Sequence, residues 1–286
     1  MVSKQGGMHY VNAIKGAGVG FVVLTALATW VPIPTLPIRL DSILTISTFL
    51  FAILAGFYTS RLGNRYDSIR QLVAVEDATI LSFYQTAKIF GPVFVKKVRS
   101  AIDHYYIASY DHTLSDYAYK QSAPYYFKLW DVITALPDKE PSSAYEALIT
   151  QLTEIEKSRN TSAATAKERL GWGEWAILLI LAGIILSSLF LMREPVLYSW
   201  IVTILFGTAL ILVMLIIRDL QNLMFGGSSL LEESGQEVLE FMGLPRYYHE
   251  HFLKLGISVV PLSVKTYRMG THKRGASTFK IKTVKR

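Results

Sequence analysis

The sequence contains no cysteine, and four long stretches of it contain no charged residue. The absence of cysteine excludes disulfides and thiol catalysis, and it removes the usual ligands of structural zinc and iron–sulfur sites. Glycine-rich phosphate loops, nucleophile elbows and paired carboxylates within the charge-free stretches are also missing from the sequence. We therefore expect neither an enzyme nor a bound cofactor.

The four charge-free stretches indicate membrane spans. Each holds 18 to 23 residues, and about 20 helical residues cross a hydrocarbon core about 30 Å thick. Buried core helices of a soluble protein are the alternative, but four such stretches in one chain favour the membrane. A mean hydropathy of +0.32 agrees with that choice. The charged residues that bound the stretches are Lys15 and Arg39, Asp41 and Arg61, Glu174 and Arg193, and Glu194 and Arg218.

We predict an all-α integral membrane protein in which four transmembrane helices form two hairpins around a helical cytoplasmic insert. Very short turns favour antiparallel neighbours. Pro32, Pro34 and Pro37 mark the end of the first span, because proline ends or bends a helix. The predicted segments are a polar lead at 1–15, a first hairpin at 16–60 with spans at about 16–36 and 42–60, an insert at 61–174, a second hairpin at 175–217 with spans at about 175–192 and 196–217, a C-terminal helical segment at 218–264 and a basic tail at 265–286.

The distribution of basic residues predicts the orientation. The two short turns carry Arg39 and Arg193, each offset by an acidic residue, whereas lysine and arginine accumulate at the opposite ends of the spans. The positive-inside rule then predicts a multi-pass protein of the cell membrane with both termini and the insert in the cytoplasm. The insert has 14 basic and 14 acidic residues, so we expect no nucleic-acid binding.

Inside the insert, the apolar pattern predicts that the second span continues as a helix over 61–90. Pro92 is expected to begin the next helix, and Ser143 with Glu146 fits a capping box that starts another. Residues 158–166 are predicted to be loop-like or weakly helical. An acidic amphipathic helix is expected at about 230–242, ended by Gly243.

Small and hydroxyl side chains follow one face of the second span, at spacings of three, four, four and three residues. Close helix packing is one interpretation of this stripe, and a pore-facing surface is the other. Phe49 and Phe51 are candidates for a hydrophobic constriction, of which Phe49 lies closest to the stripe. Phe57 points away from the stripe and is expected to contact lipid. The stripe consists of Thr45, Thr48, Ala52, Gly56 and Thr59.

Arg61 and Arg65 follow the second span one helical turn apart. They are either ordinary anchors at the membrane surface or an electropositive ring that concentrates anions at the cytoplasmic mouth of an oligomer. The tail from residue 265 carries eight basic residues and no acidic one. We expect it to be a disordered or stranded solvated tail, with contact to anionic headgroups as the alternative.

Histidines next to acidic residues are a weak metal signal. His104 and His112 stand eight residues apart, about two helical turns, so one ion cannot readily take both from a straight helix. The run His249–His251 is equally weak. We expect packed or surface polar residues at these positions and no metal site.

Four segments resemble the bestrophin-like proteins, as does the order of spans, insert and C-terminal segment. The resemblance implies a homo-oligomer, pentameric as in the bestrophins, with a pore lined by the second span and chloride or similar small anions as the permeant species. The acidic calcium clasp of eukaryotic bestrophins has no counterpart here, so calcium gating is not implied. The segments are RQLVAVEDATILSFYQTA at 70–87, Glu174-Trp175, IRDLQNLMFGG at 217–227 and GLPRYY at 243–248.

Two functional hypotheses follow. The first is an oligomeric channel for small anions, embedded in membrane lipid. The second is a non-conducting membrane scaffold or sensor whose cytoplasmic helices bind a partner, and it predicts that the stripe is packed between helices of a monomer or dimer.

Overall fold

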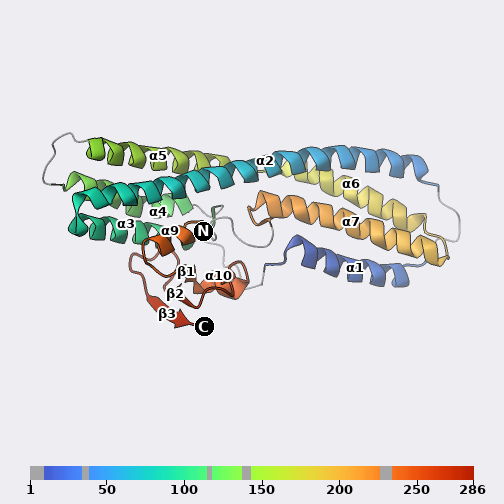
Figure 1. The fold of residues 1–286 in the computed structure, drawn as a ribbon. Coiled ribbons are helices and arrows are strands. Elements are labelled where there is room, and N and C mark those ends of the chain that lie inside the picture. Colours follow the sequence, from blue (N-terminus) through green and yellow to red (C-terminus); the bar gives the residue numbers. More distant parts are fainter. Residues whose placement is uncertain (1–9, 34–38, 115–117, 137–142, 226–233) are drawn as a thin grey trace. The chain divides into compact units, whose positions relative to one another are not determined.

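The computed structural model describes residues 10–33, 39–114, 118–136, 143–225 and 234–286. The chain is mostly helical (Figure 1). It divides into two compact units: one contains residues 11–64 and 169–227, and the other contains residues 1–10, 65–168 and 228–286. We call them the apolar unit and the polar unit. The helix α2 (Asp41–Ala87) contributes its first part to the apolar unit and its second part to the polar unit.

The apolar unit consists of α1 (Ala13–Trp30), the first part of α2, α6 (Trp172–Leu191) and α7 (Leu197–Gln221). All four helices are long and apolar enough to cross a membrane, as the charge-free stretches predicted. The first helix ends at Trp30, before Pro32, rather than near residue 36. Pro34 and Pro37 lie outside the described residues.

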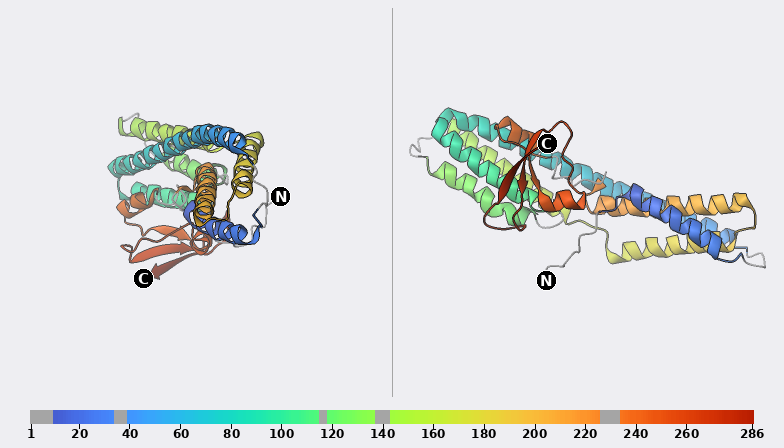
Figure 2. Two further views of the ribbon diagram at one scale, coloured as in Figure 1. Left: turned by 90° about the vertical axis from the view of Figure 1, so that its right-hand side faces the viewer. Right: turned by 90° about the horizontal axis from the view of Figure 1, so that it is seen from below.

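Helix α1 packs closely against α7 (Figure 1, Figure 2). The sequence predicted a tight hairpin of α1 with α2, but the close neighbour of α1 is α7. Small residues explain why α1 packs against α7. An added Cβ on Gly20 would meet Ile211, and an added Cβ on Gly207 would meet Leu24. Glycine at these positions lets the two helices approach.

Charged side chains of the apolar unit hold both ends of α1. At its start, the backbone N–H of Ala13 donates to Asp219 over 2.8 Å. At its end, the buried guanidinium of Arg193 donates to the carbonyl oxygens of Ala28, over 2.7 Å, and Val31, over 2.6 Å. An acidic group at the N-terminus and a basic group at the C-terminus both complement the helix dipole.

Helices α6 and α7 are joined by a turn of a few residues, and they run antiparallel. The indole N–H of Trp175, near the start of α6, donates to Gln221 at the end of α7 over 3.0 Å. The side chain of Glu174 accepts the N–H of Gly171 over 2.6 Å and closes the first turn of α6.

The polar unit has a helical core of α2, α3 (Pro92–Tyr110), α4 (Ala118–Thr134) and α5 (Ser143–Ala166), with the short η1 (Lys88–Phe90) after α2. Pro92 begins α3, as predicted. Helix α5 continues to Ala166, so of the two states predicted for 158–166, loop-like or weakly helical, the structure has the helix. Three polar residues of this segment are buried within the unit: Ser158, Arg159 and Ser162.

The C-terminal part of the polar unit adds two short helices and a sheet to a chain that we predicted to be all-α. The helices are α9 (Gln236–Phe241) and α10 (Glu250–Leu255). Strand β2 (Thr266–Gly270) pairs with β1 (Tyr247–His249) in parallel and with β3 (Ile281–Lys285) in antiparallel fashion (Figure 2). The basic tail therefore contains two strands. Gly243, with φ 73°, follows α9 as predicted, while residues 230–233 of the expected longer helix lie outside the described residues.

Candidate functional site

The small-residue stripe of α2 lies on an open face of the apolar unit. Thr45, Ala52 and Gly56 are exposed, and Thr48 and Thr59 are half-buried. A Cβ added to Gly56 would meet no atom within 4 Å. The buried face of this part of α2 carries other residues: Ser47, Phe51, Ala55, Tyr58 and Leu62. Within the single chain, the stripe is therefore not used for packing against the other described helices.

The two constriction candidates lie on different faces of α2. Phe49 is 65% exposed, on the open side. Phe51 is 6% exposed and packs inside the apolar unit, so its ring is not available to an open surface of the single chain. Phe57 is 60% exposed, with its ring edge-on to that of Tyr58.

Arg61 and Arg65 have different surroundings. Arg61 is partly exposed and forms a 3.0 Å ion pair with Glu174 at the start of α6. Arg65 is buried, and its guanidinium donates to the carbonyl oxygens of Thr165, over 3.0 Å, and Ala166, over 2.7 Å. These are terminal carbonyls of α5, which have no partner within their own helix. Arg65 thus caps α5, and only Arg61 presents its charge toward solvent.

Further along α2, within the polar unit, two adjacent carboxyl groups lie in the helical core. The hydroxyl of Tyr105 donates to Glu76. Asp77 accepts three hydrogen bonds: from Tyr106 over 2.7 Å, from the backbone N–H of Gly235 over 2.8 Å and from the hydroxyl of Ser234. Asp77 therefore ties α2 to α3 and to the chain just before α9.

Burial raises the pKa of Glu76 to about 7, although Arg159 and the hydrogen bond from Tyr105 act in the opposite direction. Burial also raises the pKa of Asp77, against its three hydrogen bonds. The guanidinium of Arg159 lies 4.5 Å from the ring centroid of Tyr105, an arrangement that stabilises the cation. This centre can therefore gain or lose a proton near neutral pH.

Sequence analysis did not single out this centre. Its signal was an adjacent Glu–Asp pair inside an otherwise apolar helical pattern, together with the paired tyrosines at 105 and 106. Neither pair predicts the centre by itself, because the neighbouring sequence does not show that the two pairs meet across the core.

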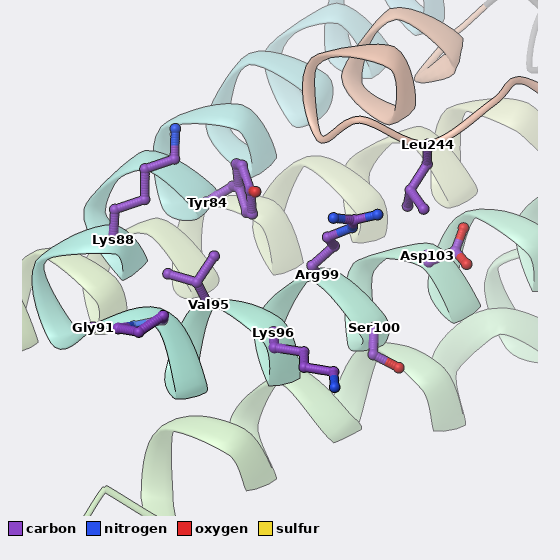
Figure 3. A pocket seen from close by; sticks show the side chains of 10 residues that line it. Tyr84, Lys88, Gly91, Val95, Lys96, Arg99, Ser100, Asp103 and Leu244 are labelled. Carbon is purple, nitrogen blue, oxygen red and sulfur yellow. The ribbon is translucent and has the colours of Figure 1, made fainter.

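A pocket of about 820 Å³ opens at the surface of the polar unit (Figure 3). Lys88 comes from η1, and Lys96 and Arg99 come from α3. Its one acidic lining residue, Asp103, forms a bidentate ion pair with Arg268 at 2.7 and 2.8 Å. The pocket is therefore basic, although the insert as a whole is neutral.

The histidine pairs considered from the sequence do not form sites as pairs. The structure instead brings Asp111 together with His249 and His272, with one ligand atom of each within 4.8 Å of the others. It is the one cluster of this kind among the described residues.

Comparison with known proteins identifies the family. Residues 19–230 match the Bestrophin-like domain. The chain belongs to the bestrophin-like family. The match contains α1 from residue 19, the other three apolar helices and the carboxyl groups of Glu76 and Asp77, and it ends before the 243–248 segment. The family is known for channels rather than for enzymes. No curated protein and no solved structure matches the chain.

Proposed function

We propose that this bestrophin-like protein is a homo-oligomeric channel of the cell membrane that passes chloride or other small anions. The subunits surround a pore lined by the first part of α2, as five copies if the assembly follows the bestrophins. Both termini and the polar unit lie in the cytoplasm in this proposal. The bestrophin-like family supports a membrane protein.

The exposed stripe on α2 is the observation that carries the proposal. Its threonines, alanine and glycine lie beside the face that packs inside the apolar unit, and Thr45, Ala52 and Gly56 are exposed. A helical threonine can donate to a carbonyl oxygen of the preceding turn, as Thr25 and Thr29 do in α1. A row of small and hydroxyl side chains on one exposed face also suits close contact with a second copy of the chain, or hydrogen bonds to water and anions in a pore.

The lining chemistry suits a weakly held anion. Hydroxyl groups donate hydrogen bonds to an anion, and the stripe contains no carboxylate that would repel it. Phe49, at the open face, is the residue we assign to the hydrophobic constriction. Phe51 is buried inside the subunit, so in this proposal its role is to support α2 from behind.

Arg61 is the cation we place at the cytoplasmic mouth. Its pair with Glu174 reduces its field, so the mouth attracts anions less strongly than two unpaired arginines would. Arg65 is buried inside the subunit, where it caps α5, so in this proposal its role is structural.

Purified protein reconstituted in liposomes tests the channel, with chloride efflux as the readout and the symmetry of the particle determined by imaging. We expect chloride flux above that of empty vesicles and a ring with the stripe facing its axis. A monomer or dimer without flux would sink the proposal.

The basic pocket supports the alternative function of a sensor or scaffold. The insert is larger than a minimal pore requires, and the pocket offers Lys88, Lys96 and Arg99 to an anionic ligand or partner. This alternative predicts binding without chloride flux, so the same liposome experiment separates the two functions.

A further inference from the structure

We propose that Asp111, His249 and His272 bind a divalent metal ion of the zinc class. All three belong to the polar unit. Asp111 is the residue that follows the last turn of α3, His249 ends β1, and His272 lies two residues after β2. The proposal is independent of ion conduction.

The sheet register brings the two histidines together. In the parallel pairing of β1 with β2, His249 is opposite Gly270, which leaves His272 just beyond the end of the same ladder. Asp111 reaches this point from the end of α3. Three segments that are distant in the sequence therefore converge because β1 and β2 pair beside α3.

The distances fit a compact site with two nitrogen ligands and one oxygen ligand. His272 Nε2 lies 2.9 Å from Asp111 Oδ2, and His249 Nε2 lies 3.8 Å from Asp111 Oδ1. Zinc–ligand bonds of about 2.0 Å place neighbouring atoms of a tetrahedral site about 3.3 Å apart. These two spacings, which run to different oxygens of the carboxylate, bracket that value, and one ligand atom of each residue lies within 4.8 Å of the others. A tetrahedral ion held by these three ligands has a fourth position for water.

The charge balance also favours a cation. The side chains of Asp111, His249 and His272 are 1%, 4% and 2% exposed. Within the described chain, no lysine or arginine forms an ion pair with Asp111, whereas its neighbour on α3, Asp103, is paired with Arg268. A buried carboxylate is stable when it is paired or coordinates a metal.

Without metal, hydrogen bonds use the same atoms. His272 Nε2 donates to Asp111, and His249 Nε2 donates to the carbonyl oxygen of His272 over 3.0 Å. Metal binding through Nε2 requires the proton of each neutral ring to move from Nε2 to Nδ1. The carbonyl of Lys280 lies 3.4 Å from Nδ1 of His272 and can accept this proton, once the 3.3 Å contact from the N–H of Lys280 to the same nitrogen has broken. For His249, the contact from the N–H of His251 must break, which lowers the affinity of the site.

Outer contacts hold the ligands in place. The hydroxyl of Tyr247 donates to Asp111 Oδ1 over 3.3 Å. The side chain of Gln236 in turn bonds both the N–H and the carbonyl of Tyr247, over 2.9 and 2.7 Å. Gly270 leaves room for this tyrosine, since a Cβ there would overlap its hydroxyl. Such outer partners orient metal ligands.

Imidazole ligands select the class of metal. Calcium and magnesium prefer sets of six or more oxygen atoms, whereas two imidazoles and one carboxylate suit zinc and neighbouring transition metals. A metal here would link the end of α3 to the sheet, which makes it a structural ion of the polar unit.

Metal titration of the full-length protein, purified without a histidine tag and treated with a chelator, tests the site. We expect one Zn²⁺ bound per chain by calorimetry and a rise of at least about 5 °C in the thermal midpoint. Asp111→Asn and His272→Gln should weaken Zn²⁺ binding more than about tenfold, and Tyr247→Phe by about tenfold.

His251→Gln is the matched control, because this histidine is close in sequence but outside the cluster, and it should leave Zn²⁺ binding unchanged. Wild-type protein decides the question even where a variant fails to fold. The proposal is overturned if folded wild-type protein binds no Zn²⁺, or if His251→Gln weakens Zn²⁺ binding as much as the ligand variants do. The three residues would then form a hydrogen-bonded Asp–His–His cluster only.

Discussion

The two parts of α2 belong to one uninterrupted helix but meet different surroundings. In the apolar unit, its side chains carry no charge from residue 42 to residue 60, and large apolar residues such as Ile46, Phe49 and Ile53 are exposed. In the polar unit, the same helix buries Ile69, Ile80 and Phe83, and it adds the half-buried acidic residues Glu76 and Asp77.

The difference shows what each part requires from outside the chain. The polar unit has an apolar core and satisfies the carboxyl groups of Glu76 and Asp77 with its own hydroxyl and N–H groups. The apolar unit exposes surface that water would not solvate favourably, so lipid or other copies of the chain must cover it.

Replacing Gly56 with Trp should abolish chloride flux in liposomes, if the stripe lines the pore. The added ring fills the open face, yet it meets no atom of the chain near the Cβ position, so the subunit should still fold. Phe57→Trp is the matched control: residue 57 is the next one along and points away from the stripe. Normal flux with Gly56→Trp, or equal loss with Phe57→Trp, would rule out the stripe as the pore lining.

Removing the carboxyl group of Asp77 should destabilise the polar unit by about 4 kcal/mol, because three donors lose their acceptor at roughly 1–3 kcal/mol each. Denaturant unfolding of Asp77→Ala in detergent measures the loss. Asp67→Ala, an exposed aspartate on the same helix, should change stability by less than about 0.5 kcal/mol. Similar values for both variants would mean that Asp77 does not hold the C-terminal segment.

Glu76 should make stability depend on pH between about 4.5 and 7. Its pKa is raised to about 7 in the folded chain, so the folded state keeps this proton where the unfolded state has lost it. The contribution of Glu76 to the free energy of unfolding is therefore complete below about pH 4.5. It falls by about 3 kcal/mol as the pH rises through 7. Thermal unfolding of Glu76→Gln should lack this decline, and identical pH profiles for both proteins would contradict the assignment.

The two arginines after the membrane part of α2 should differ in importance. Arg65→Ala removes two buried, charge-assisted hydrogen bonds to the end of α5 and should cost about 2 kcal/mol in unfolding free energy. Arg61→Ala removes a partly exposed ion pair and should cost less than about 1 kcal/mol. Equal costs would show that the capping of α5 adds nothing to stability.

Local patterns predicted much of the fold. The charge-free runs predicted four long apolar helices, the apolar spacing predicted the continuation of α2, and the ring of Pro92 predicted the start of α3. Each prediction depends on residues within one or two helical turns. The sequence left 158–166 open between loop and weak helix, because serine, asparagine and threonine favour a helix weakly although alanine favours it, and the core that buries part of this segment comes from other helices.

Contacts between distant segments could not be predicted in this way. The partner of α1, the meeting of Asp77 with Gly235 and the convergence of Asp111 with two histidines all depend on residues more than 100 positions apart. The spacing of small residues predicted the stripe on α2. The exposure of the stripe in the single chain could not be predicted, because spacing alone does not reveal which neighbours a helix face has.

The packing of α1 against α7 has a consequence for biosynthesis. Ala13 and its acceptor Asp219 are 206 residues apart, so a ribosome releases the first helix long before it makes the helix that accommodates it. Until then, the glycines of α1 and the first N–H groups of this helix lack their final partners. The apolar unit can therefore be completed only after α7 has been made, and the polar unit follows it, because residues 228–286 are synthesised last.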